Sequence, residues 1–327
     1  MDIDNCIKIA DELSESVFNS IHEKKCNCLL YSGGIDTTFI ALSLLKRNVD
    51  QKLISVLIND AKDKYYINYF AEKIGAKINV FNFDVSSPEI DDCLNLVLKI
   101  LKLIDPIEII SGISVCLGLK KAKELNCNCI STGDGGDELF FGYDFLLDKK
   151  ENYLNNWLKN VIRNAFFNSK PISQSFGINL LQPLYSKKVK EISIKTPLEC
   201  KINYIDNKKY GKLLLRKFIL MHGLKDIALR DKTPITSGSG ADNLLNLWKK
   251  LTTIEEIKDL KEKYKIDFTS HAHAYLFKKG IQLGLFKDRS IAKENKCPIC
   301  GSPMKNGFCR FCGAYISDGK ISVYSDF

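Results

Sequence analysis

Two segments of the 327-residue sequence combine glycines, hydroxyls and a carboxylate in a spacing that suits a nucleotide phosphate. The first, YSGGIDTT at residues 31–38, lies where a predicted strand turns into a predicted helix, so its backbone amides face an incoming anion. Its carboxylate would repel a phosphate unless a cation stood between them, and Mg²⁺ plays that role in proteins. The residues expected around the phosphates are Ser32, Gly33, Gly34, Asp36 and Thr37.

The second segment, TGDGGDELFFGY at residues 132–143, adds further carboxylates. It follows another predicted strand, and the carboxyl ends of parallel strands meet at the edge where doubly wound folds bind ligands. Neither segment is a Walker loop, which would end in Gly-Lys-Ser or Gly-Lys-Thr. An isolated SGG sequence is usually an ordinary turn with the following aspartate as a helix cap. Two carboxylate loops at one edge favour a nucleotide site instead.

Alternating strand and helix patterns position these segments. Short buried strands are predicted at residues 26–31, 52–58, 77–83 and 127–132, with helices at 36–48, 63–75, 89–103 and 112–125. The alternation predicts an α/β fold built on a doubly wound parallel sheet. Leu-, Lys- and Asn-rich segments without a strand signal follow, so the second half is predicted to be helical. The expected parts are an N-terminal helix (1–24), an α/β core (25–150), a helical part (151–290) and a C-terminal zinc ribbon (291–327).

The C-terminal part contains four cysteines in the spacing C-x₂-C-x₈-C-x₂-C, with a glycine after each pair. This spacing predicts two tight knuckles that present four thiolates to a tetrahedral Zn²⁺ ion. With every position taken by a thiolate, such an ion is structural and not catalytic. The expected ligands are Cys297, Cys300, Cys309 and Cys312.

Together the two carboxylate segments resemble the synthetase domain of asparagine synthetases and β-lactam synthetases, whose signature is an SGGxD loop followed by a GEGxDELFGGY-like loop. The resemblance implies an adenine nucleotide α-hydrolase-like fold and an ATP pyrophosphatase that uses ATP and Mg²⁺. It places Asp36 and Asp137 on magnesium, and Thr132 and Gly133 near the adenosine. Asp134 stands where the family has a catalytic glutamate and is the candidate acid or base.

The resemblance continues weakly through GINLLQPLYSKKVKEI (177–192) and KYGKLLLRKFI (209–219), and it reaches ALRDK at 228–232. Lys232 matches a family lysine that stabilises charge during adenylate and amide formation, a use to which a fixed cation is suited. Asp134 is one methylene shorter than glutamate, and Phe141 replaces a usual glycine, so the acceptor end of the pocket differs from the family pattern.

The resulting first interpretation is an AMP-forming carbon–nitrogen ligase that adenylylates a small-molecule or macromolecular carboxylate and transfers it to ammonia or an amine. Because the sequence has no glutaminase domain and no cysteine at position 2, we expect free ammonia, a separate ammonia-supplying subunit or a different nucleophile. The alternative is an enzyme that adenylylates a tRNA base before nitrogen or sulfur insertion, with the zinc ribbon contacting RNA. The formal charge of +9 permits such a partner. A nonenzymatic nucleotide-binding protein is disfavoured by the intact pair Asp36 and Asp137.

The sequence shows neither an export signal nor an apolar run of membrane-spanning length, so we expect a cytoplasmic protein without a membrane partner. In a reducing compartment its twelve cysteines should bind metal or be buried, without forming disulfides. Two Cys-Asn-Cys repeats begin predicted strands, and burial as small apolar side chains explains them. A redox or cluster role, as in tRNA-thiolating relatives of the superfamily, stays open for Cys26, Cys28, Cys127 and Cys129.

Overall fold

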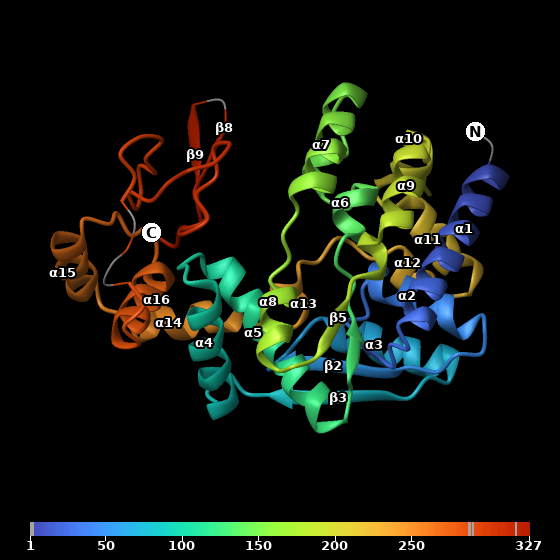
Figure 1. Ribbon diagram of the computed structural model, residues 1–327, viewed down its shortest axis with the longest axis horizontal. Helices are drawn as coiled ribbons and strands as arrows, with labels where there is room; N and C mark the ends of the chain where they lie inside the picture. Colours follow the sequence, from blue (N-terminus) through green and yellow to red (C-terminus); the bar gives the residue numbers. More distant parts are fainter. Residues whose placement is uncertain (1–2, 287–288, 290, 318) are drawn as a thin grey trace. The chain divides into compact units, whose positions relative to one another are not determined.

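The computed structural model describes residues 3–286, 289, 291–317 and 319–327 (Figure 1). Residues 1 and 2 of the expected N-terminal helix, and residues 287, 288 and 290 at the end of the expected helical part, lie outside this description. The chain divides into two compact units, each described here by itself. Unit 1 consists of Met1–Val56, Lys62–Phe81 and Gly118–Pro234, and unit 2 of Leu57–Ala61, Asn82–Leu117 and Ile235–Phe327.

A five-stranded sheet has the strand order β3-β2-β1-β4-β5. The strand β1 (Cys28–Leu30) pairs in parallel with β2 (Lys52–Ile58) and with β4 (Cys129–Ser131), and β4 pairs in parallel with β5 (Asn179–Leu181). The strand β3 (Ile78–Phe83) lies at the other edge. The direction of strand succession reverses between β1 and β4, which is where doubly wound folds bind ligands. The predicted α/β fold is confirmed.

Four helices follow the strands in the predicted alternation. They are α2 (Ile35–Leu45), α3 (Asp63–Ile74), α4 (Pro88–Leu101) and α5 (Pro106–Glu124). The helix α2 is apolar on nearly all sides and almost completely buried, as expected for a helix inside a core. The helix α5 begins six residues earlier than predicted, at Pro106, because proline suits the first position of a helix.

The second half contains short strands that the sequence did not reveal. Besides β5, the strands β6 (Asn203–Ile205) and β7 (Lys208–Tyr210) form an antiparallel hairpin. Asp206 and Asn207 connect them with positive φ angles of 49° and 63°, as a tight hairpin turn requires. Three-residue strands are too short to show a period-two pattern, which is why the sequence favoured helix alone.

Helices make up the rest of unit 1. They are α1 (Ile3–Glu23), α6 (Gly136–Phe140), α7 (Glu151–Asn164), α8 (Ser169–Ser175), α9 (Lys187–Lys195), α10 (Leu198–Lys201), α11 (Leu213–Met221) and α12 (Lys225–Ala228). The apolar stripe of α1, with Leu13, Val17 and Ile21, is buried. The helix α1 packs against α2, α9 and α11 (Figure 1). The N-terminal helix is therefore part of the same core as the sheet.

Six cysteines are paired in disulfides, contrary to the expectation of free thiols. The two Cys-Asn-Cys repeats are buried as predicted, but they also start neighbouring strands, so thiols about a hundred residues apart in sequence meet. Their Cα atoms lie 4.7 and 6.1 Å apart, within the range of disulfides. No pattern within either repeat could show this pairing. The disulfides are Cys6–Cys200, Cys26–Cys129 and Cys28–Cys127.

Unit 2 anchors the C-terminal segment. Its helices include α13 (Ile235–Gly238), α14 (Asn243–Lys250), α15 (Ile254–Tyr264) and α16 (His271–Gln282), and its end forms the hairpin β8 (Tyr315–Ser317) and β9 (Lys320–Ser322). The amide of Ile104 donates to the carbonyl of Phe311 at 2.6 Å. His273 Nε2 donates to the carbonyl of Cys312 at 2.9 Å. Contacts from two different parts of unit 2 thus hold the cysteine segment.

Among the described residues, no helix combines the length and the apolar character needed to cross a lipid bilayer.

Candidate active site

The two carboxylate loops lie side by side because they leave the carboxyl ends of the neighbouring strands β1 and β4. Asp36 lies in the first turn of α2 and Asp137 in the first turn of α6. A Cβ atom at Gly136 would lie 2.0 Å from Asp36 Oδ1, and one at Gly142 would lie 2.0 Å from Asp137 Oδ1. These two glycines therefore allow the backbone of the second loop to approach both carboxylates.

Lys212 joins the two carboxylates, although the sequence did not single it out. Its Nζ lies 2.5 Å from Asp36 Oδ2 and 2.8 Å from Asp137 Oδ1. The residue is the N-cap of α11, and its backbone amide donates to the carbonyl of Phe140 at 2.8 Å, at the end of α6. A signal existed, because Lys212 lies in the segment that resembles the K-x-x-L-R sequence of the family. Its partner Asp36 is 176 residues away, so spacing could not reveal the contact.

Lys232, which the sequence did predict, reaches the same place. Its Nζ donates to Asp137 Oδ2 at 2.6 Å, and 24% of its side chain is exposed, against 5% for Lys212. Two carboxylates and two ammonium groups thus form the carboxylate–lysine centre, defined as Asp36, Asp137, Lys212 and Lys232. Its formal charges cancel.

Electrostatics act differently on the two carboxylates of this centre. Burial opposes ionisation of Asp137, but the ammonium groups of Lys212 and Lys232 outweigh it and lower the pKa of Asp137 to about 2. Burial likewise disfavours the Lys212 ammonium, yet the two carboxylates raise its pKa above the usual value. Burial raises the pKa of Asp36, against the opposing effect of Lys212. Asp36 Oδ1 is buried and has no hydrogen-bond partner among the described residues, so one carboxylate oxygen is free to bind a cation.

The loop after β1 is held by its own hydroxyls. Ser32 Oγ lies 3.2 Å from Thr37 Oγ1, and the amide of Gly34 donates to Ser32 Oγ at 3.3 Å. Gly34 is the N-cap of α2, so the first amides of this helix face the loop. The five residues predicted to surround phosphates therefore lie in one tight turn at a helix N-terminus; their binding role remains a prediction.

Arg230 clamps this loop from outside and was not predicted. Its Nη1 donates to the carbonyl of Gly33 at 2.8 Å and its Nη2 to Asp63 Oδ1 at 2.7 Å. The guanidinium also lies over the ring of Tyr66, 3.8 Å from the centroid. Arg216 in turn donates to the carbonyl of Arg230 at 2.9 Å. The backbone that carries Lys232 is thereby connected to the loop after β1.

Asp134 lies in a separate set of hydrogen bonds. Its Oδ2 accepts from Thr132 Oγ1 at 2.7 Å, from Ser169 Oγ at 2.5 Å and from Gln182 Nε2 at 3.0 Å. A Cβ at Gly133 would lie 3.0 Å from Asp36 Cβ, so the two loops also approach closely at this residue. These contacts fix Asp134 firmly; its predicted role as acid or base, and the predicted place of Thr132 and Gly133 beside adenosine, stay predictions.

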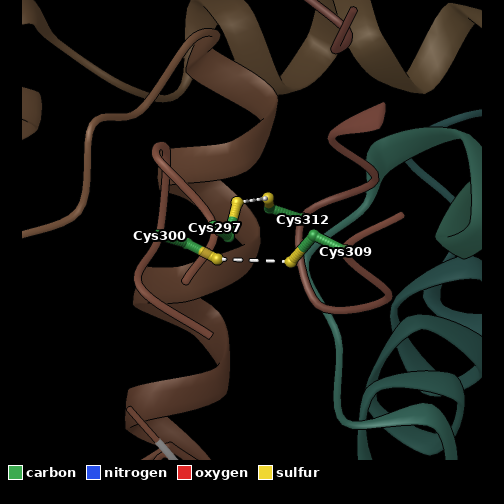
Figure 2. A group of neighbouring side chains, drawn as sticks. All are labelled: Cys297, Cys300, Cys309 and Cys312. Atoms are coloured by element: carbon green, nitrogen blue, oxygen red, sulfur yellow. Dashed lines mark hydrogen bonds between the residues drawn. The ribbon is translucent and has the colours of Figure 1, made fainter. Parts of the chain in front are cut away.

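The four C-terminal cysteines form the cysteine cluster, in which two loops present two thiols each toward a common point (Figure 2). Their sulfur atoms all lie within 4.8 Å of one another, and all four residues are buried. Cys297 Sγ is 3.6 Å from Cys312 Sγ, and Cys300 Sγ is 3.5 Å from Cys309 Sγ. Four converging thiols are a donor set that can hold a metal ion.

Comparisons with known proteins identify a family whose match includes both carboxylate loops. The family described as asparagine synthase matches residues 8–176, slightly more than half of the chain. A putative asparagine synthetase 1 of Methanocaldococcus jannaschii, named as glutamine-hydrolyzing, is 24% identical over 277 residues. The match covers 82% of this chain and 47% of the relative, so the chain spans about half the relative's length.

Among solved structures, the U34-tRNA thiolase NcsA from Methanococcus maripaludis with its 4Fe-4S cluster is 14% identical, with a TM-score of 0.37. The alignment covers 93% of this chain and 86% of the thiolase. A likeness of this size carries no argument about function.

Proposed function

This chain belongs to the asparagine synthase family, and we propose on that basis that it is an ATP-dependent ligase that adenylylates a carboxylate and transfers it to ammonia or an amine. The observation that carries the proposal is the carboxylate–lysine centre at the point where strand succession reverses. Two acidic loops and two lysines from separate segments converge there, beside the amides of a helix N-terminus.

In the proposed reaction, the pyrophosphate part of ATP lies on the loop of residues 32–37, where backbone amides can donate to phosphate oxygens. Asp36 and Asp137 would hold Mg²⁺, which offsets phosphate charge, and the unpartnered Asp36 Oδ1 fits this use. Thr132 and Gly133, at the end of β4, would border the adenosine. The substrate carboxylate attacks the α-phosphorus, and pyrophosphate leaves.

The same centre suits the second step. The amine or ammonia attacks the carbonyl carbon of the acyl-adenylate, and AMP leaves. The Lys232 side chain is partly exposed and its ammonium donates to Asp137, so this ammonium could turn from Asp137 toward the developing negative charge. Asp134, held by three donors, is the proposed acceptor of the proton that the amine loses.

For the cysteine cluster we propose a structural Zn²⁺ ion. The spacing of two and eight residues, the burial and the convergence of four sulfurs match a closed tetrahedral site. Metal analysis of the purified chain tests this identity: one equivalent of zinc, without iron or the visible absorption of an iron–sulfur cluster, is the expected result.

The reaction is tested by following the fate of ATP labelled at the α-phosphate in the presence of Mg²⁺ and pooled carboxylates. We expect labelled AMP and an equal amount of pyrophosphate, together with exchange of labelled pyrophosphate into ATP. Formation of ADP would contradict an adenylylation mechanism. A labelled adenylate that reacts with bulk tRNA, and not with carboxylates, would identify the RNA-modifying alternative.

A further inference from the structure

Three aromatic side chains form a cluster that begins at the carboxylate–lysine centre. The rings of Tyr143 and Phe145 stack with 5.7 Å between centroids and 23° between planes. Trp157 on α7 meets Tyr143 at 6.0 Å and Phe145 at 5.4 Å, edge to face in both cases. Lys232 Nζ lies 5.4 Å from the centroid of Tyr143, while it contacts Asp137 on its other side. The aromatic cluster, Tyr143, Phe145 and Trp157, therefore adjoins the proposed reacting groups.

One end of this cluster is fixed and the other is open. The Tyr143 hydroxyl donates to Glu138 Oε1 at 2.5 Å, so its ring is held in place. Phe145, in contrast, is 54% exposed, so its ring is accessible to a ligand. The indole N–H of Trp157 is buried and has no hydrogen-bond partner among the described residues. Buried donors are nearly always paired in native proteins, so this N–H is an exception whose hydrogen bond a bound ligand could complete.

We propose that the aromatic cluster binds a planar aromatic ring carried by the acceptor substrate, which is the molecule that receives the adenylyl group. Offset and edge-to-face contacts with Phe145 and Trp157 would hold the ring, because aromatic pairs prefer these arrangements. An acceptor group of the same molecule would then lie near Lys232, since the Tyr143 ring contacts both Phe145 and that ammonium group. The inference rests on the proposed ligase function and narrows its substrate class to aromatic or heteroaromatic acceptors.

The ring can belong to a free acceptor or to a base of single-stranded RNA, because stacking on aromatic side chains serves both. The two sources predict different changes in affinity as the ligand becomes longer. A free acceptor binds as a single ring, whereas an RNA strand gains further contacts from its other nucleotides and its phosphates, and those contacts weaken with salt.

The chain provides its own reporter, because it has two tryptophans, Trp157 and Trp248. Trp248 is 2% exposed and stacks on Tyr275 in unit 2. The variant Trp248→Phe therefore leaves Trp157 as the single indole. Its fluorescence is measured with Mg²⁺ and a non-hydrolysable ATP analogue in excess, so that added rings cannot enter the nucleotide site.

Benzoate, nicotinate and uridine are titrated against cyclohexanecarboxylate, which has the carboxylate but no planar ring. We expect a saturable change in Trp157 fluorescence for at least one flat ring, with binding roughly fivefold or more tighter than for the saturated ring. Phe145→Ala should weaken ring binding by a similar factor, Phe145→Tyr should preserve it, and Tyr204→Ala, which removes an exposed aromatic ring of the β6–β7 hairpin, should have no effect.

A further titration with hexauridylate shows whether the ring belongs to a free acceptor or to RNA. Binding at least tenfold tighter than that of uridine, and lost with added salt, assigns the ring to RNA; equal affinity assigns it to a free acceptor. The inference is overturned if no ring changes the fluorescence up to its solubility limit, if the saturated ring acts equally, or if Phe145→Ala has no effect. AMP formation is measured separately: ring binding with ADP as product would defeat the ligase function alone, and AMP formation without ring binding would defeat this inference alone.

Discussion

The carboxylate–lysine centre and the cysteine cluster each bring four side chains together, but they balance charge in different ways. In the first, two carboxylates meet two ammonium groups, so the centre is compensated by the chain itself. In the second, four thiols converge, and four thiolates require a bound cation. We therefore expect the first site to form before its ligand binds, and the second to depend on the proposed ion for stability.

The largest expected effect comes from removing one charge of the first centre. Asp36→Asn and Asp137→Asn should each lower the rate of pyrophosphate release by about a thousandfold or more, because each removes a proposed ligand of Mg²⁺ and leaves ammonium charge in excess. The measurement is pyrophosphate release at saturating ATP and Mg²⁺. Asp148→Asn is the matched control, since the Asp148 side chain is 91% exposed and pairs with Lys209 at the surface. Activity within tenfold of the parent in both variants would contradict the proposed role of the two carboxylates as Mg²⁺ ligands.

The two lysines should separate structural from chemical roles. Lys212→Met removes a buried cation from between two carboxylates and should lower the free energy of unfolding by about 3 kcal/mol, the scale for a broken buried ion pair. Lys232→Ala should lower the chemical step by about a hundredfold while ATP affinity changes little, and Lys232→Arg should not restore it, because a planar guanidinium replaces a compact ammonium. Single-turnover kinetics, ATP binding and thermal unfolding are measured for all three variants.

Two results would contradict this division. Equal losses of stability in Lys212→Met and Lys232→Ala would make both lysines structural. A large loss of ATP affinity in Lys232→Ala with an unchanged chemical step would mean that Lys232 positions the nucleotide only.

The same contrast explains what the sequence could and could not predict. The four proposed ligands of the cysteine cluster lie within sixteen consecutive residues, so their spacing predicted a metal site directly. The two carboxylate loops were predictable because each follows a strand. The contacts of Lys212 with Asp36 and of Arg230 with Gly33 could not be predicted, because they arise from packing between segments that are remote in sequence. The three disulfides were missed for the same reason, since each joins cysteines about a hundred residues or more apart in sequence. The strand β5 was missed because its three residues are too few to show an alternating pattern.

The stability of the cysteine cluster should depend on its metal ion, whereas the stability of the carboxylate–lysine centre should not. Removing the metal, or replacing Cys300 by Ser, should abolish stoichiometric zinc and lower the unfolding temperature of unit 2, because binding energy of the ion is folding energy there. Cys93→Ala is the control, since Cys93 is another buried free cysteine of unit 2 outside the cluster. Metal analysis and calorimetry are the measurements. Full zinc content in Cys300→Ser would contradict the assignment of the ligands.

The smallest predicted effect concerns Arg230, which acts on the first centre only through the loop after β1. Arg230→Lys should raise the KM for ATP about tenfold with a smaller change in kcat, on the scale of one charge-assisted hydrogen bond of roughly 1.5 kcal/mol. A lysine ammonium cannot donate to Gly33 and Asp63 in one plane and also lie flat on Tyr66, so the loop would lose its fixed position. Inhibition by added pyrophosphate should weaken by a similar factor, because the same loop is proposed to bind it. Arg163→Lys, at an exposed position of α7, is the matched control. A lower unfolding temperature with an unchanged KM for ATP and unchanged inhibition by pyrophosphate would show that Arg230 supports the fold without positioning the loop. The carboxylate–lysine centre would then depend on its own four charges alone.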